Sequence, residues 1–514
     1  MIKSKIVIST ILPERKYLQL GLHNLKSYSM KNCVNSNYID ICLYEINPDT
    51  YHHTHGTTFP FLNENALFKH ALKILKKKPT IIGFSCFMWN IDLILQICRI
   101  IKTLDRTVIL VLGGPEASID PRKLLKQNTN LDLIVKDEGE VAFSKIIDTI
   151  YSNERNYSTI QGVTYRVGHR IYQNEYTDII DLKTLPSPYL NHHIPLGTDV
   201  SLALETSRGC PFTCAYCTYS IRGYHKLRFF PIERILKELR YILPKNPKSL
   251  RITDDNFNIN PPRAILILNQ IKKYIKDTEI KIFLNASMWA IDKALIKLLK
   301  KNDLTCSVGV QSVNEKALKL ISRKNNLSIL EENLMRFDKY KMKYELSFII
   351  GLPGENFKEI LKSINWAAKF NPKEINLFPL MVFEGTKMQR DSKQLGLSTY
   401  ERPYYVIKET RNLSKVDIKK GIVLREYIGL IYNQGFLRKT IGLLAENLDF
   451  QFADIVEKMG KIIKMGEYAK NTRRTQRAVV KNFINKYAPK YIFSQLTNAM
   501  NSDYSYYESR TNKN

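Results

Sequence analysis

Apolar runs alternate with amphipathic stretches along residues 1–150. The runs predict short strands at 5–10, 38–46, 80–86, 107–114 and 131–140. The stretches between them predict helices at 16–30, 65–77, 90–103 and 141–152. Strands that alternate with helices form a parallel, doubly wound α/β sheet, and ligands of such sheets bind at the carboxyl ends of the strands. Here those ends carry Ser85, Gly113, Gly114 and Glu138.

A second alternating series follows a connector. Residues 159–176 predict a hairpin that turns at Gly168, and the proline-containing segment 184–190 marks a domain boundary. Beyond this boundary, strands are predicted at 201–206, 249–254, 280–286, 305–311, 344–350 and 375–380. Helices are predicted at 232–243, 262–276, 290–301, 314–321, 327–340 and 357–369. Six strand–helix units predict a partial (βα)6 barrel.

The strand signals stop near residue 400, and 415–470 is mostly helical in pattern. The final segment is polar and predicts a disordered tail. We therefore expect a Rossmann-like domain, a hairpin with a linker, a barrel, a helical domain and a tail, at 1–155, 156–197, 198–395, 396–500 and 501–514.

Composition places the chain among ordinary globular proteins, with 44% hydrophobic residues. No run of about 18 apolar residues predicts a membrane span, and the first residues do not resemble a signal peptide, so a cytoplasmic protein is expected. The formal charge of +29 fits a polyanionic partner or a compositional bias. The lysines are spread over many segments, which favours the bias and does not favour a nucleic-acid partner.

Three of the eight cysteines lie within eight residues, in the order Cys210, Cys214 and Cys217. A disulfide framework would spread its cysteines along the chain, so this group indicates a metal site. Thiolates are the usual ligands of iron–sulfur clusters, and three of them leave one iron open for substrate chemistry. The alternative is a structural zinc site with His225 as a fourth ligand.

The segment Glu205-Thr-Ser-Arg-Gly-Cys210-Pro-Phe-Thr-Cys214-Ala-Tyr-Cys217 resembles the cluster-binding loop of the radical S-adenosylmethionine (SAM) superfamily. The resemblance implies that the three cysteines bind a [4Fe–4S] cluster and that SAM completes the fourth iron. It also implies reductive cleavage of SAM to a 5′-deoxyadenosyl radical. An electron donor such as flavodoxin or ferredoxin is then expected.

Further segments at the predicted strand ends resemble the same superfamily in order and spacing. Candidate SAM contacts are Asp254, Asp255, Asn285, Ser287, Gln311, Ser312, Gly351, Pro353 and Gly354. The last three belong to a Gly-Leu-Pro-Gly-Glu turn, which lies against the adenine in that family. The second strand ends in Asp-Asp-Asn-Phe rather than the family's Gly-Gly-Glu, so the contact to the SAM amine is left open.

The N-terminal segments around Ser85, Gly113 and Glu138 resemble the cobalamin-binding domain that precedes many radical SAM modules. Cobalamin contacts are therefore expected from Ser85, Trp89, Gly113, Gly114 and Glu138. The loop after the first strand lacks the histidine of the classical Asp-x-His-x-x-Gly motif, so bound cobalamin is expected without a histidine lower ligand. The alternative is a domain that has lost its cofactor and only caps the barrel.

Three functions follow from these observations. The first is a cobalamin-dependent radical SAM enzyme that methylates an unactivated carbon. The second keeps the radical step but performs a cyclisation or rearrangement without methyl transfer. The third is a non-catalytic iron–sulfur or nucleic-acid-binding protein. The sequence identifies no catalytic residue, and small-molecule, lipid and peptide substrates all stay open.

Overall fold

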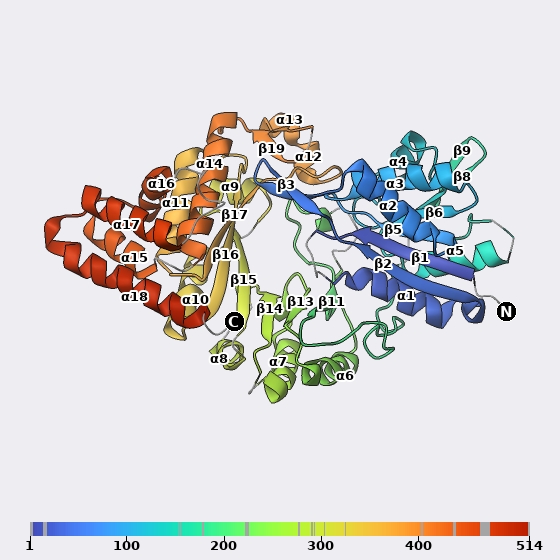
Figure 1. The fold of residues 1–514 in the computed structure, drawn as a ribbon, viewed down its shortest axis with the longest axis horizontal. Coiled ribbons are helices and arrows are strands. Elements are labelled where there is room, and N and C mark those ends of the chain that lie inside the picture. Colours follow the sequence, from blue (N-terminus) through green and yellow to red (C-terminus); the bar gives the residue numbers. More distant parts are fainter. Residues whose placement is uncertain are drawn as a thin grey trace. The chain divides into compact units, whose positions relative to one another are not determined.

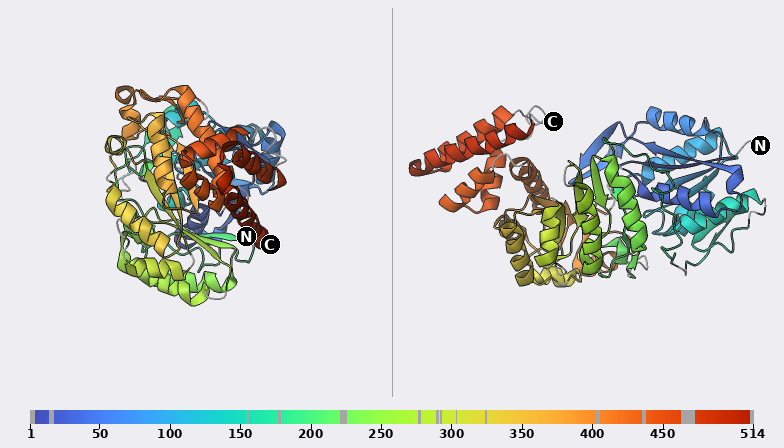
Figure 2. Two further views of the ribbon diagram at one scale, coloured as in Figure 1. Left: turned by 90° about the vertical axis from the view of Figure 1, so that its left-hand side faces the viewer. Right: turned by 90° about the horizontal axis from the view of Figure 1, so that it is seen from below.

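The computed structural model (Figures 1 and 2) describes most of the chain. The described residues are 4–13, 18–152, 154, 156–176, 179–220, 226–275, 278–288, 291, 293–302, 304–323, 325–401, 405–434, 438–462 and 473–511. They form two compact units. The first comprises residues 1–211, 222–257 and 262–283, and the second comprises residues 212–221, 258–261 and 284–514.

The first unit contains a seven-stranded sheet in the order β2-β1-β5-β6-β7-β8-β9. Its strands are β1 (Ser4–Ile11), β2 (Ile39–Ile46), β5 (Pro79–Ser85), β6 (Ile109–Gly113), β7 (Leu133–Val135), β8 (Val163–Val167) and β9 (Arg170–Gln173). The pairs among β1, β2, β5, β6 and β7 are parallel, whereas β8 and β9 continue the sheet antiparallel. The predicted doubly wound sheet is confirmed, and the predicted hairpin forms its edge.

Helices cover both faces of this sheet because each presents an apolar stripe to it. One face packs on α1 (Leu20–Asn32) and α5 (Glu140–Tyr151). The other packs on α2 (Glu64–Leu75), α3 (Ile91–Leu104) and α4 (Pro121–Gln127). The strands buried between these layers read as nearly continuous apolar runs, as parallel strands do.

A six-stranded sheet follows in the order β10-β13-β14-β15-β16-β17. Its strands are β10 (Ser201–Leu204), β13 (Ser249–Ile252), β14 (Lys281–Asn285), β15 (Thr305–Gln311), β16 (Lys343–Ile350) and β17 (Glu374–Pro379). The intervening helices are α6 (Ile232–Ile242), α7 (Pro261–Ile275), α8 (Lys293–Lys301), α9 (Glu315–Leu320), α10 (Leu327–Lys339) and α11 (Phe357–Ala368). The boundary between the units falls within β14. These strands and helices confirm the predicted βα series.

Helices dominate the rest of the second unit. After the short elements α12 (Lys387–Arg390), α13 (Ser392–Leu395), β18 (Ser398–Thr399) and β19 (Ile407–Glu409), the chain forms α14 (Lys415–Ile428) and a π-helical turn (Gly429–Asn433). The later helices are α15 (Arg438–Asn447), α16 (Phe452–Ile462), α17 (Arg473–Tyr487) and α18 (Phe493–Thr511). Among the described helices, none combines the length and apolar character needed to cross a lipid bilayer.

Two features of this fold were not predicted from the sequence. Residues 501–511, predicted as a disordered tail, continue α18, because Asp503 accepts hydrogen bonds from the backbone N–H groups of Lys439 and Thr440. This contact is tertiary, so the polar composition of the tail did not reveal it. In addition, β3 (Thr50–Thr54) and β4 (Thr57–Phe61) form a hairpin after β2 that the apolar pattern had not indicated.

Candidate functional site

The cysteine segment begins at the carboxyl end of β10. Directly before it, β11 (Ser207–Arg208) pairs antiparallel with β12 (Arg228–Phe229). Gly209 then adopts a φ of +94°, a left-handed conformation that favours glycine. The chain therefore turns sharply at the residue before Cys210, as a loop that wraps a cofactor requires.

Asp254, at the end of β13, fixes the peptide that leads into this turn. One carboxylate oxygen accepts hydrogen bonds from the backbone N–H groups of Thr206 and Ser207, at 2.7 and 3.1 Å. The other accepts from the hydroxyls of the same two residues, at 2.5 and 2.8 Å. Burial raises the pKa of Asp254, while these hydrogen bonds oppose the rise. Asp254 was predicted as a SAM contact, and its observed partners give it a part in holding the loop.

None of the three cysteines forms a disulfide within the described part of the chain. In the first unit, the side-chain amide of Asn256 donates to Cys210 Sγ at 3.4 Å. In the second unit, the Arg323 guanidinium donates to Cys214 Sγ at 3.6 Å. The backbone beyond Cys214 is also held in place, because Ala215 N–H donates to the carbonyl of Ile321 and Ala215 carbonyl accepts from Met388 N–H.

This donor set fits an iron–sulfur cluster. Hydrogen bonds to the sulfurs stabilise thiolate charge and tune a cluster's potential. Among the described side chains, no three His, Cys, Asp or Glu groups lie close enough to hold a single metal ion. In a [4Fe–4S] cluster each thiolate binds a different iron, so its ligands stand farther apart than those of one ion. His225, the alternative zinc ligand, lies outside the described residues.

The other predicted SAM contacts lie at strand ends as expected. Asp255 follows β13 in the first unit, and Asn285 is the last residue of β14. In the second unit, Ser287 exchanges two 2.7 Å hydrogen bonds with the buried side-chain amide of Asn258. Gln311 ends β15 with a φ of +71°, which holds its side chain against the backbone of Gly309.

The Gly-Leu-Pro-Gly-Glu turn follows β16. Gly351 has a φ of +94°, and a Cβ there would lie 2.8 Å from Ile407 Cγ2, so only glycine fits beneath β19. Pro353 and Gly354 complete the turn, and Gly354 is also left-handed, with a φ of +85°. The turn ends at the buried carboxyl of Glu355, which sequence reasoning did not select.

Glu355 is 1% exposed and accepts a hydrogen bond from the hydroxyl of Ser312, at the end of β15. Its Oε2 atom has no hydrogen-bond partner among the described residues. Burial raises the pKa of Glu355 to about 8, with a smaller opposing effect from Ser312. The side chain is therefore a neutral acid near pH 7, and it ties the turn after β16 to the end of β15.

Four of the predicted cobalamin contacts lie at the carboxyl edge of the N-terminal sheet. Ser85 ends β5 and Trp89 follows it, and Gly113 ends β6 and Gly114 follows it. Gly114 has a φ of +90°, and a Cβ there would lie 2.8 Å from the carbonyl oxygen of Cys86. The buried indole N–H of Trp89 has no partner among the described residues. An unmatched indole donor, and a glycine at which two strand ends approach closely, suit a large polar ligand such as a corrin.

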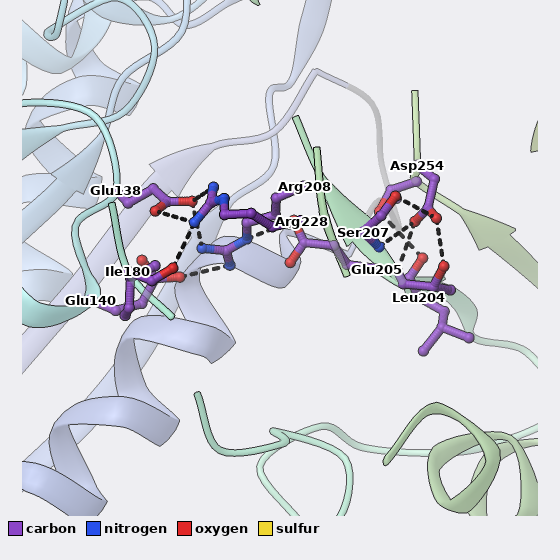
Figure 3. Close-up of polar contacts among 11 residues, drawn as sticks. Glu138, Glu140, Ile180, Leu204, Glu205, Ser207, Arg208, Arg228 and Asp254 are labelled. Atoms are coloured by element: carbon purple, nitrogen blue, oxygen red, sulfur yellow. Dashed lines mark hydrogen bonds and ion pairs between the residues drawn. The ribbon is translucent and has the colours of Figure 1, made fainter. Parts of the chain in front are cut away.

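The fifth predicted cobalamin contact, Glu138, has different partners. Its carboxylate accepts two hydrogen bonds from Arg228, at 2.7 and 3.0 Å, and a weaker one from Arg208, at 3.3 Å. Arg208 also pairs with Glu140, at 2.7 Å, and with Glu205, at 2.9 Å. Sequence reasoning missed both arginines, although Arg208 stands two residues before Cys210 in the motif itself (Figure 3).

Comparison with known proteins identifies two domains in the chain. The profile of the radical SAM superfamily matches residues 204–367, and that of the B12 binding domain matches residues 67–147. An uncharacterised methyltransferase of Pyrococcus horikoshii is 25% identical over 64% of this chain and 72% of its own length. The cobalamin-dependent radical SAM methyltransferase TokK of Streptomyces tokunonensis is 25% identical over 64% of this chain, which spans about half (51%) of TokK.

The radical SAM methyltransferase TsrM of Kitasatospora setae, solved with cobalamin and a [4Fe–4S] cluster, has the same fold. Its TM-score is 0.64 at 12% identity, with 94% of this chain and 99% of TsrM covered. The chain thus combines a radical SAM domain with a B12-binding domain, and the expected resemblance is confirmed. The two matched domains imply SAM and a [4Fe–4S] cluster for the first and cobalamin for the second.

Proposed function

We propose that this chain, in which a B12-binding domain precedes a radical SAM domain, is an enzyme that methylates an unactivated carbon of its substrate. The observation that carries the proposal is the C-x3-C-x2-C segment placed at the carboxyl end of the first strand of the βα series. Catalytic groups of such barrels lie at this edge. The methyltransferases among the relatives support methyl transfer over cyclisation or rearrangement.

In this proposal each segment has a defined task. Cys210, Cys214 and Cys217 hold the cluster, while Asn256 and Arg323 donate hydrogen bonds to two of the sulfurs. When bound, the cluster and SAM together supply a radical that removes hydrogen from the substrate, and cobalamin supplies the methyl group.

The strand-end residues bind SAM in this proposal. They are Asp255, Asn285, Ser287, Gln311, Ser312, Gly351, Pro353 and Gly354. Asp254 keeps the turn before Cys210 in place through Thr206 and Ser207. The corrin is held by Ser85, Trp89, Gly113 and Gly114, where backbone and side-chain donors meet at one sheet edge.

The partners and the location are part of the same proposal. Cleavage of SAM needs one electron at a time, so we expect flavodoxin or ferredoxin as the donor. Cysteines that must stay reduced to hold a cluster are expected in a reducing compartment, which favours the cytoplasm. The substrate class is left open among small molecules, lipids and peptides.

The first experiment uses the full chain purified without oxygen, with its cluster reconstituted and cobalamin added. It is incubated with methyl-labelled SAM, a reductant and candidate small-molecule, lipid or peptide substrates. Three quantities are measured: 5′-deoxyadenosine, the visible spectrum of the desalted protein, and the mass and label content of the substrates. We expect deoxyadenosine together with retained corrin absorbance. The variant Cys214→Ala should form no deoxyadenosine, whereas Cys42→Ala, which removes a half-buried thiol of β2, should match the parent chain.

Each other result has a definite meaning. Deoxyadenosine without retained corrin would reject methyl transfer through cobalamin and leave a radical enzyme with an N-terminal cap. Retained corrin with no label transferred to any candidate substrate, but with a rearranged product, would favour the cyclase alternative. A loaded cluster with no deoxyadenosine would reject the enzyme in favour of a binding protein.

A further inference from the structure

A buried cluster of charges joins two distant segments of the first unit. Glu138 and Glu140 follow β7, in the segment matched by the B12-binding profile, whereas Arg208 immediately precedes the cysteine turn. The Arg208 side chain is 12% exposed, and those of Glu138 and Glu140 are 6% and 7% exposed. These contacts span 68 and 70 residues of sequence, so folding and not local pattern brings the groups together.

The geometry of this cluster depends on the guanidinium fork of Arg208. Its Nε, NH1 and NH2 groups donate to three different carboxylates, those of Glu205, Glu138 and Glu140. Burial alone would lower the pKa of Arg208, but the three carboxylates raise it well above its usual value. A fork fixes the plane and direction of its donors, which a lysine ammonium does not do.

The peptide between β10 and Cys210 is therefore held from two sides (Figure 3). Asp254 binds Thr206 and Ser207 on one side, and Glu138 and Glu140 bind Arg208 on the other. Arg228, paired with Arg208 across the short ribbon of β11 and β12, completes the clamp by binding both oxygens of Glu138. Buried ion pairs of this kind fix a geometry more than they add stability.

We propose that Glu138, Glu140 and Arg208 are positioning residues that set the orientation of the Cys210 peptide from the carboxyl edge of the N-terminal sheet. This inference rests on the proposed function, because it takes Cys210 to be a ligand of the [4Fe–4S] cluster. It also gives Glu138 a task different from the cobalamin contact expected from the sequence. Ion pairs thereby join the segment after β7 to the peptide before Cys210. A change in the side chains after β7 should therefore alter the position of Cys210.

The test compares Arg208→Lys, Glu138→Gln and Glu140→Gln with Glu238→Gln as the matched control. Arg208→Lys keeps the charge and removes the fork. Glu138→Gln presents an amide N–H to guanidinium donors that cannot accept a hydrogen bond. Glu238 forms a similarly buried ion pair with Arg234 in α6, with exposed fractions of 2% and 14%, and this pair is separate from the three ion pairs of Arg208.

Two readouts are independent of turnover. The first is amide hydrogen exchange of residues 205–210 in the chain without cofactors, which reports local opening of the peptide. The second is the electron paramagnetic resonance spectrum of the reduced cluster, with and without SAM. For the three variants of the buried charge cluster, at Arg208, Glu138 and Glu140, we expect faster amide exchange in residues 205–210. We also expect the spectrum of the reduced iron–sulfur cluster to differ from that of the parent chain. The deoxyadenosine rate should fall by about 10- to 100-fold, as it does when groups that orient metal ligands are removed.

Glu238→Gln should lower the melting temperature and leave both readouts as in the parent chain. If the variants at Arg208, Glu138 and Glu140 change only the melting temperature, as Glu238→Gln does, the charge cluster only adds stability and the inference is wrong. If Arg208→Lys fails to fold, the milder Glu140→Gln, which removes a single contact, decides the question. Failure of the proposed function would look different, because the parent chain itself would then form no deoxyadenosine, retain no corrin or transfer no label, while the exchange comparison among the variants stays readable.

Discussion

Two buried carboxyl groups beside predicted cofactor segments are stabilised in opposite ways. In the first unit, Glu138 meets two guanidinium groups and is a charged partner in an ion cluster. In the second unit, Glu355 meets one hydroxyl, from Ser312, and its other oxygen has no partner among the described residues. Burial raises the pKa of Glu355 to about 8, so Glu355 is protonated near pH 7. Glu138, in contrast, forms ion pairs with Arg208 and Arg228.

The difference shows that burial alone does not decide what a carboxyl does. A buried carboxylate in an ion pair holds its cationic partner in one position, because separating the two would leave uncompensated buried charge. A buried neutral carboxyl needs no cationic partner, but its ionisation at higher pH makes the stability of the fold depend on pH. The first arrangement suits positioning of a loop, and the second suits a turn that must only stay closed.

The largest effect is expected from Arg208→Met, which leaves three carboxylates without their shared cation. Breaking a buried ion pair from one side costs about 3–5 kcal/mol, and here the upper end is expected. The measurement is urea denaturation near pH 7, compared with Glu355→Gln, which removes no paired charge. A loss below about 1 kcal/mol for Arg208→Met would show that water screens the cluster and that the comparison is wrong.

The next effect is a loss of stability as pH rises, caused by Glu355. Its pKa is raised from 4.5 to about 8 on folding, so its stabilising effect is complete below pH 4.5 and disappears as pH rises through 8. The free energy of unfolding should fall by about 4 to 5 kcal/mol over that window. In Glu355→Gln this slope should vanish. A slope that persists in the variant would assign the titration to another group.

A smaller effect of opposite direction is expected from His23 in α1. Burial lowers its pKa from 6.5 to about 4, with a partly opposing hydrogen bond that its Nδ1–H donates to the His193 carbonyl. Stability should therefore be complete above pH 6.5 and fall by about 3 kcal/mol as pH drops through 4. Urea denaturation between pH 4 and 7 measures this effect, and His23→Gln should flatten the acid side only. An unchanged acid slope would contradict the assignment.

The smallest effect is expected from Asp254→Asn. Both backbone N–H donors bind Oδ1, which the amide keeps, and the hydroxyls of Thr206 and Ser207 can turn and accept from the new amide N–H. The loss should be about 1 kcal/mol by urea denaturation. Asp254→Ala, which removes every acceptor, should cost more. Equal losses for the two variants would mean that the negative charge itself holds the turn.

Much of the fold followed from sequence pattern because the period of apolar residues is a local property. The six strands of the βα series and the helices between them were predicted within a few residues, since each combines a short apolar run with turn residues at its end. The helix that replaces the predicted tail was not, because α18 depends on Asp503 meeting α15. Polar composition predicts an exposed or disordered segment only when no other helix or strand binds its polar side chains.

The sequence by itself determined the domain pair and the cysteine loop. Spacing within thirteen residues, from Glu205 to Cys217, carries that chemistry, and glycines mark where the chain must turn left-handed. Only the tertiary structure decided that Glu138 and Glu140 meet Arg208, and that Glu355 is buried with a single donor. The physical reason is that charge pairing and desolvation depend on which distant groups share one volume, and no local pattern records this.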